Sequence, residues 1–167
     1  ILVPIAGMHF GYVEISFFFF SIGLVFWLPL MAISLNRSFF FSPLPKKLLP
    51  TQFILIAPPA VAFLSWISLK DSFDDFAVLL YYFALFAAVM TISQAKRFLG
   101  LEFSMPWWAF SFPLAAITIA SFAFYSRLPL SHYQWIAVSF FVSLVGVMGL
   151  LTFKTLRALT KGSLLQP

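Results

Sequence analysis

Charged residues divide this chain into long uncharged windows. Five windows contain 22, 22, 20, 24 and 26 uncharged residues, and the charges that flank them are Glu14 and Arg37, Lys47 and Lys70, Asp75 and Lys96, Glu102 and Arg127, and Arg127 and Lys154. A helix needs roughly 20 apolar residues to cross about 30 Å of hydrocarbon. The pattern therefore predicts five membrane-spanning helices, at about 15–36, 50–69, 76–95, 104–126 and 132–153.

The composition agrees with a membrane protein. The chain is 62% hydrophobic and only 9% charged, with a mean hydropathy of +1.02, whereas soluble domains contain about 25% charged residues. Backbone groups in lipid must be paired within the protein, and the alternating segments of about ten residues that a β-barrel requires are absent. We therefore predict an all-α integral membrane protein that forms one transmembrane domain over residues 1–167.

The basic residues predict the orientation. If the five helices alternate in direction, eight of the ten basic residues fall on the side of the C-terminus, which the positive-inside rule places in the cytoplasm. Only Lys70 and Arg127 fall on the opposite side. The net charge is +5, but no run of basic residues is longer than two. We therefore expect the lipid bilayer as a partner and no nucleic acid.

Prolines recur with a nearly constant spacing. Pro59 and Pro113 are 54 residues apart, Pro4 and Pro59 are 55 apart, and small residues follow each of them. Coincidence among 11 prolines is one interpretation. The other is a repeat of helical hairpins, in which a proline-kinked inner helix is followed by a plainer outer helix. Residues 1–10 would then be the end of a further kinked helix, in a fragment of a longer membrane domain.

The windows offer no catalytic constellation. They contain no charged residue, the chain has no cysteine, and its two histidines, His9 and His132, are far apart in the sequence. Metal sites, nucleophilic catalysis and proton relays all need such groups. We therefore expect no metal, no cofactor and no enzymatic activity.

Neutral polar residues repeat in the fourth window. Ser104, Ser111 and Thr118 are spaced by seven residues, so they would lie within roughly 40° of one another on an α-helix. Such a stripe is expected either to line a neutral pore or to pack against a neighbouring helix, because Ser and Thr also bond to backbone carbonyls. The spacing leaves both interpretations open.

Two motifs resemble a known family. The stretch from Leu49 to Val61, which contains Ala57-Pro58-Pro59, and the stretch Trp107-Trp108-Ala109-Phe110-Ser111-Phe112-Pro113 are similar to the tellurite-resistance/dicarboxylate transporter family, to which bacterial TehA and plant slow anion channels belong. The resemblance implies ten helices in five hairpins around a central pore, assembled as a homotrimer in the bacterial inner membrane. This chain would supply the C-terminal half, from the end of the fifth helix onward.

The resemblance also implies a function and a gate. It implies an anion channel in which Phe112, just before Pro113, closes the pore. Packing of Phe112 in the helix bundle is the alternative interpretation, because the chain contains 24 Phe. A secondary transporter for dicarboxylates, tellurite or cationic drugs is the alternative function, and a structural membrane subunit is a third.

Overall fold

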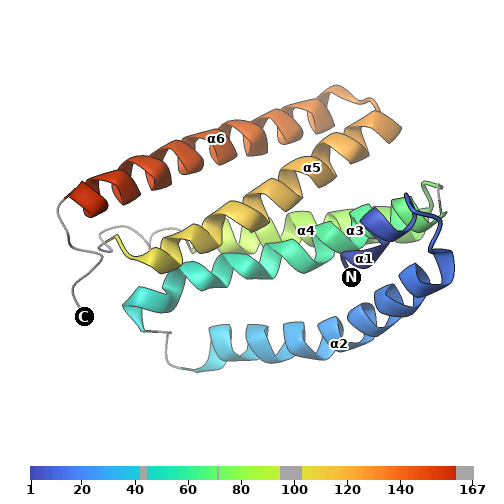
Figure 1. The fold of residues 1–167 in the computed structure, drawn as a ribbon, viewed down its shortest axis with the longest axis horizontal. Helices are drawn as coiled ribbons and strands as arrows, with labels where there is room; N and C mark the ends of the chain where they lie inside the picture. The colour runs from blue at the N-terminus through green and yellow to red at the C-terminus, as the bar shows by residue number, and fades with distance from the viewer. Residues whose placement is uncertain (42–44, 71, 95–102, 161–167) are drawn as a thin grey trace.

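The structure is a computed structural model that describes residues 1–41, 45–70, 72–94 and 103–160. All regular structure in these residues is helical. In chain order the elements, with η for 3-10 helices, are α1 (Val3–Gly7), α2 (Val13–Phe40), η1 (Lys46–Ile56), α3 (Ala57–Lys70), α4 (Asp75–Ser93), η3 (Met105–Phe110), α5 (Ser111–Arg127) and α6 (Ser131–Thr160) (Figure 1).

Five helices in the described residues are long and apolar enough to cross a membrane. Two of them combine a 3-10 helix with the α-helix that follows it, over Leu48–Lys70 and Met105–Arg127. The other three are α2, α4 and α6. These helices confirm the prediction of an all-α membrane protein.

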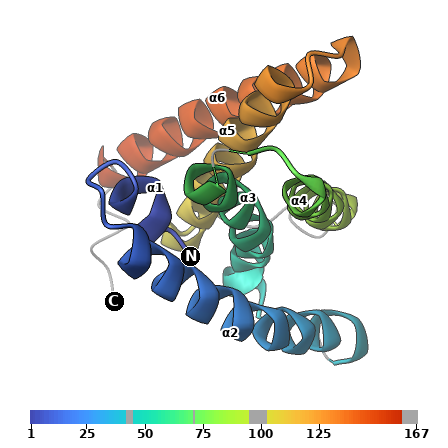
Figure 2. The same cartoon turned by 90° about the vertical axis from the view of Figure 1, so that its right-hand side faces the viewer.

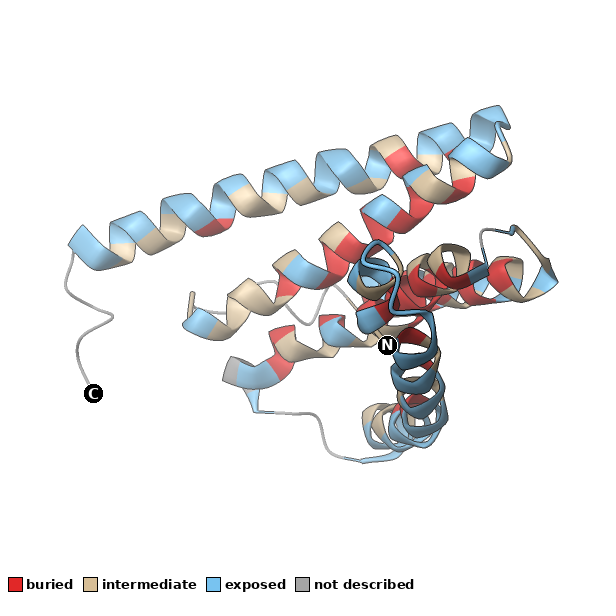
Figure 3. Ribbon diagram, turned by 45° about the vertical axis from the view of Figure 1, so that its right-hand side comes forward, coloured by how far each residue is buried: buried red, intermediate tan, exposed pale blue. Residues whose placement is uncertain are grey.

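The helices that contain Pro59 and Pro113 are the most buried. In the most apolar stretches of Leu48–Lys70 and Met105–Arg127, 56% and 50% of residues are buried, against 17% in α2, 39% in α4 and 11% in α6. Figure 2 shows α3 in the middle of the bundle, with α2 and the α5–α6 pair on opposite sides. Buried positions concentrate on α3, α4 and α5, while α6 is exposed along most of its length (Figure 3). An inner and an outer layer of helices therefore exist within this chain.

The two ends of the bundle differ. The α1–α2, α3–α4 and α5–α6 connections lie together at one end, which we call the connection end (Figure 1). The opposite end, which we call the basic end, contains η1, η3 and the C-terminal part of α6. Lys70, Asp74 and Arg127 belong to the connection end, and Arg37 and Arg157 to the basic end.

The helix type changes just before Pro59 and Pro113. Each proline is the third residue of its α-helix, and each junction has a 3-10 hydrogen bond, from the Ala57 N–H to the Ile54 carbonyl and from the Ser111 N–H to the Trp108 carbonyl. A proline within an α-helix lacks the N–H and clashes with the carbonyl four residues earlier. In the first turn of an α-helix that N–H has no partner in any case. The repeat is therefore a repeated 3-10-to-α junction.

The hairpin repeat predicted that the outer helices lack a proline kink. The outer helix α2 does not fit this prediction. Pro29 lies inside α2, where it removes the N–H that would bond to the carbonyl of Val25. The helix is visibly bent (Figure 1), which is the usual effect of an interior proline.

The first residues of the chain are held between α2 and α3. The Ser65 hydroxyl donates a hydrogen bond of 2.7 Å to the carbonyl of Ile1. Gly23 allows α2 to approach closely, since a Cβ at this position would lie 2.5 Å from Ile1 Cγ1 and 2.7 Å from Ile1 N. Gly7 similarly lies against Ser16, where a side chain would clash with the serine hydroxyl. Residues 1–7 are therefore packed onto the bundle.

An aromatic cluster joins α3, α4, α5 and α6. Its members are all buried and are Phe63, Tyr81, Phe124 and Tyr133. The Tyr81 and Phe124 rings stack with centroids 4.0 Å apart, and the Tyr81 hydroxyl donates to Ser121 Oγ at 3.2 Å. The hydroxyl groups of Tyr133 and Tyr82 are hydrogen-bonded at 2.5 Å. The aromatic cluster therefore combines stacking with paired polar groups.

Candidate functional site

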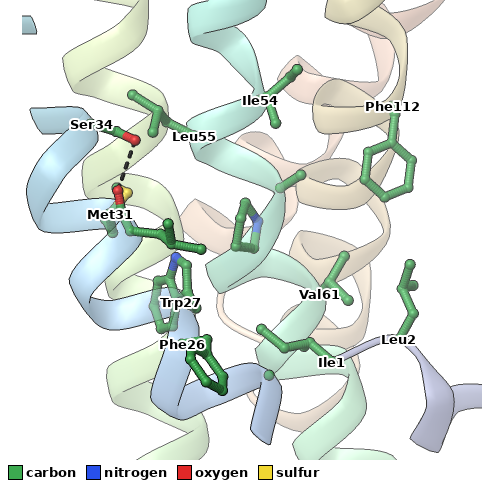
Figure 4. Close-up of a pocket in the computed structure, with 14 residues that line it drawn as sticks. Ile1, Leu2, Phe26, Trp27, Met31, Ser34, Ile54, Leu55, Val61 and Phe112 are labelled. Atoms are coloured by element: carbon green, nitrogen blue, oxygen red, sulfur yellow. Dashed lines mark hydrogen bonds between the residues drawn. The ribbon is translucent and has the colours of Figure 1, made fainter. Parts of the chain in front are cut away.

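An apolar cavity of about 470 Å³ opens between α2, α3 and the start of the chain. Its wall is formed by Ile1 and Leu2, by the middle of α2, by the η1–α3 junction and by Phe112 of α5 (Figure 4). Nearly all of the lining side chains are hydrocarbon or aromatic; the polar groups among them are the Ser34 hydroxyl and the Trp27 indole N–H. The cavity therefore presents an apolar surface to anything that enters it.

Phe112 and Phe110 lie in different surroundings. Phe112 is 52% exposed and lines the cavity, where its ring projects from α5 toward Val61 and Leu2 (Figure 4). Phe110 is 8% exposed and meets Phe53 of η1 edge to face, with ring centroids 4.4 Å apart. Residues two apart on a helix point to nearly opposite sides, so the contact between η1 and η3 directs Phe112 outward.

The three repeated prolines are buried and do not line the cavity. Pro4, Pro59 and Pro113 are among the most deeply buried side chains of the described chain. Pro58, the residue before Pro59, does line the cavity. Pro59 and Pro113 affect the shape of the cavity only indirectly. Each favours a 3-10-to-α junction just before it, and the backbone at that junction sets where the neighbouring side chains point.

The serine and threonine residues of the fourth window do not share one exposed stripe. Ser104 precedes η3, and its buried hydroxyl has no hydrogen-bond partner. Ser111 begins α5 and donates to the Trp108 carbonyl at 2.7 Å. Thr118 is buried and donates to the Leu114 carbonyl at 2.6 Å. A 3-10 segment separates Ser104 from the other two, so the seven-residue spacing does not align them as it would on a continuous α-helix.

Trp27 of α2 is a cavity residue that the sequence analysis did not identify. It is 8% exposed, and its indole N–H has no hydrogen-bond partner, although a buried donor normally has one. The ring packs edge to face on Phe83 of α4, with centroids 5.6 Å apart. The only signal in the sequence was a residue with an N–H donor in the middle of an apolar window.

In the described residues, the charged side chains lie toward the ends of the helices. Asp74 caps α4 by accepting hydrogen bonds from the Ala77 N–H at 2.9 Å and the Trp66 indole N–H at 2.8 Å. These two donors hold the pKa of Asp74 below its usual value, the Ala77 bond being the larger cause. Lys70 lies over the rings of Phe17 and Trp66. Within the described residues no three His, Cys, Asp or Glu side chains are grouped for a metal ion.

The described residues form a bundle of five helices that are apolar enough to cross a membrane, with an apolar cavity between them, which is the architecture of a multi-pass membrane protein. Residues 1–156 match the family described as voltage-dependent anion channel. The chain therefore belongs to the voltage-dependent anion channel family.

Curated relatives come from a plant and an archaeon. The S-type anion channel SLAH2 of Arabidopsis thaliana is 36% identical over 115 residues, which are 69% of this chain and 22% of the relative. The guard cell S-type anion channel SLAC1 of the same plant is 26% identical over 71% of this chain and 21% of its own length. An uncharacterized transporter of Methanocaldococcus jannaschii is 29% identical over 81% of this chain and 46% of its own length. The aligned part is thus less than half of each of these relatives.

No solved structure matches the chain significantly. The relatives named above are, by name, channels and a transporter.

Proposed function

We propose that this chain forms part of an anion-conducting pore, and that Phe112 is its gate. The observation that carries the proposal is the position of Phe112. It is a half-exposed aromatic side chain at the start of an inner helix, and it projects into an apolar cavity. Membership of an anion channel family supports the proposed ion class.

The physical argument concerns the hydration of the ion. An anion that enters a narrow apolar constriction must lose water, and the apolar wall provides no polar group in exchange. A phenyl ring at the narrowest point therefore blocks conduction without any charged residue. Removal of the ring widens the constriction and admits water.

The backbone around Phe112 suits a movable side chain. Phe112 is the second residue of α5, between the 3-10 junction at Ser111 and Pro113. Because Pro113 provides no N–H, the carbonyl of Ala109 lacks its α-helical partner. The backbone at this position is held by fewer helical hydrogen bonds than the middle of α5, so a small change at the junction reorients the ring.

Anion flux through variants of the full-length protein tests the proposal. The protein is reconstituted in liposomes, and chloride efflux is compared between wild type and Phe112→Ala. We expect a rise of about tenfold or more, since tenfold corresponds to only about 1.4 kcal/mol of barrier. The matched control is Phe122→Ala, because Phe122 is a 40% exposed Phe on the same helix that packs on Phe141 of α6.

Equal efflux through wild type, Phe112→Ala and Phe122→Ala, at equal protein content, would refute the gate. Efflux that saturates with chloride concentration at a low turnover would instead indicate a carrier. A rise in Phe122→Ala as large as that in Phe112→Ala would show that any loss of aromatic bulk from α5 opens the pathway.

We further propose that residues 1–10 are the end of an inner helix and that preceding segments complete the pore in the full-length protein. The packed position of Ile1 and the limited coverage of the longer relatives support this. The homotrimer, the bacterial inner membrane and the cytoplasmic C-terminus stay predictions. Labelling of a cysteine introduced at Arg157 in intact cells and in inverted vesicles tests the last of these, because the chain contains no native cysteine.

A further inference from the structure

The packing between α5, which carries Phe112, and α6 changes from one end of the bundle to the other. At the connection end α6 packs closely on α5, and Tyr133 and Ala137 are buried there. Toward the basic end α6 diverges from the α5–η3 segment (Figure 1). In that part of α6 only Leu151 is buried. Contacts that bridge α6 and η3 at this end therefore depend on long side chains.

Two consecutive tryptophans of η3 form such contacts. The indole N–H of Trp108 donates a hydrogen bond of 3.1 Å to the hydroxyl of Thr155. The ammonium group of Lys154 lies over the ring of Trp107, 4.8 Å from its centroid, in a cation–π contact. Neighbouring residues of η3 thus bind neighbouring residues of α6.

Trp108 is also bonded to the residue beside Phe112. Its carbonyl accepts the 3-10 hydrogen bond from the Ser111 N–H, and it also accepts a bond of 2.7 Å from the Ser111 hydroxyl. A continuous series of hydrogen bonds therefore runs from Thr155 through Trp108 to Ser111. Phe112 follows Ser111 directly in the chain.

We propose that Trp107 and Trp108 are positioning residues, which bind η3 to the basic end of α6 and thereby hold the Phe112 ring in the cavity. This inference rests on the gate proposed above. The backbone alone holds η3 weakly, because 3-10 hydrogen bonds have poorer geometry than α-helical bonds and Pro113 interrupts the α-helical pattern. The two side-chain contacts supply what the backbone lacks, and a displacement of the basic end of α6 moves the ring.

The expected effect of losing one contact is moderate. A hydrogen bond of this kind changes an equilibrium by a factor of about two to ten. Loss of the Trp108–Thr155 bond therefore shifts the closed-to-open equilibrium, and the chloride efflux of a mostly closed pore, by about two- to tenfold. Trp108→Phe removes the N–H donor and keeps an aromatic ring, and Thr155→Val removes the hydroxyl with little change in shape.

The experiment measures chloride efflux from liposomes that contain the full-length protein with Trp108→Phe, Thr155→Val or both. Each single variant should raise efflux about two- to tenfold, and the double variant should raise it no further, because both changes remove the same bond. Trp66→Phe is the matched control. It removes an indole hydrogen bond of 2.8 Å to Asp74 at the connection end, and it should leave efflux unchanged.

The same variants are then placed in the Phe112→Ala protein. If the contacts act through the ring, they have no effect once the ring is absent, whereas a general loosening of the bundle would raise efflux in both backgrounds. Wild-type efflux in Trp108→Phe and Thr155→Val, together with raised efflux in Phe112→Ala, overturns the positioning role and leaves the gate intact. Unchanged efflux in Phe112→Ala itself refutes the gate, so the two failures are distinguishable.

Discussion

The aromatic cluster and the wall of the apolar cavity both contain aromatic side chains, but these side chains lie in different surroundings. In the aromatic cluster the rings are buried, and the hydroxyl groups of Tyr81 and Tyr133 both have partners. In the cavity wall Phe112 is half exposed, and the indole N–H of Trp27 has no partner. Aromatic content by itself therefore does not distinguish a packed core from the wall of a cavity. Phe112 differs from the cluster in how completely the neighbouring helices surround its ring, and Trp27, which is buried, differs in its unpaired N–H group.

The comparison predicts a large difference in stability between two Phe→Ala variants of α5. Phe124 is fully buried and stacked on Tyr81, so Phe124→Ala should lower the unfolding free energy by about 3–5 kcal/mol. Phe112→Ala removes a half-exposed ring and should cost less than about 1 kcal/mol. Thermal unfolding in detergent measures both. Equal losses in the two variants would show that Phe112 is part of the packed core.

A smaller effect is expected where the start of the chain lines the cavity. Gly23→Ala places a methyl group where Ile1 lies, and should destabilise the protein by about 1–3 kcal/mol. Gly146→Ala is the control, because a Cβ there meets no atom within 4 Å, and it should be neutral or stabilising by up to about 1 kcal/mol. Equal melting temperatures for the two variants would mean that Ile1 is not held against α2.

Thr118→Val separates packing from pore lining. Thr118 is buried and its hydroxyl bonds to its own helix, so the variant should lose about 1 kcal/mol of stability or less and keep wild-type chloride efflux. A changed efflux at unchanged stability would instead place Thr118 on the conduction pathway. Liposome efflux and thermal unfolding of the same preparation decide between the two.

The smallest expected effect is the contribution of Asp74 to the pH dependence of stability. Its pKa is lowered from the usual 3.8 by the N–H groups of Ala77 and Trp66, so folding favours the ionised carboxylate. The stabilisation is therefore fully present above the unfolded pKa and is lost as the pH falls through the lower folded pKa. Melting curves between pH 6 and 3 should show a steeper loss in wild type than in Asp74→Asn. Parallel curves would show that this cap contributes nothing.

Part of the site could be predicted from the sequence. The Trp-Trp motif before Pro113 directed attention to Phe112, and the structure places Phe112 in the cavity and Phe110 in the packed interior. Trp27 was not predicted, because α2 appeared only as an outer helix. The role expected for Ser104 also depended on a continuous α-helix, whereas a 3-10 segment intervenes.

The sequence by itself determined the number of spans and the ends at which charges lie, because a charged group inside hydrocarbon is costly and every backbone group there must be paired within a helix. It did not determine which face of each helix is buried. Lipid and protein interior are both apolar, so a membrane helix lacks the polar face that reveals orientation in a soluble protein. Only the tertiary structure, in which η1 meets η3 and Ile1 lies against Gly23, decided that Phe110 is packed, that Phe112 is exposed and that Trp27 borders the cavity.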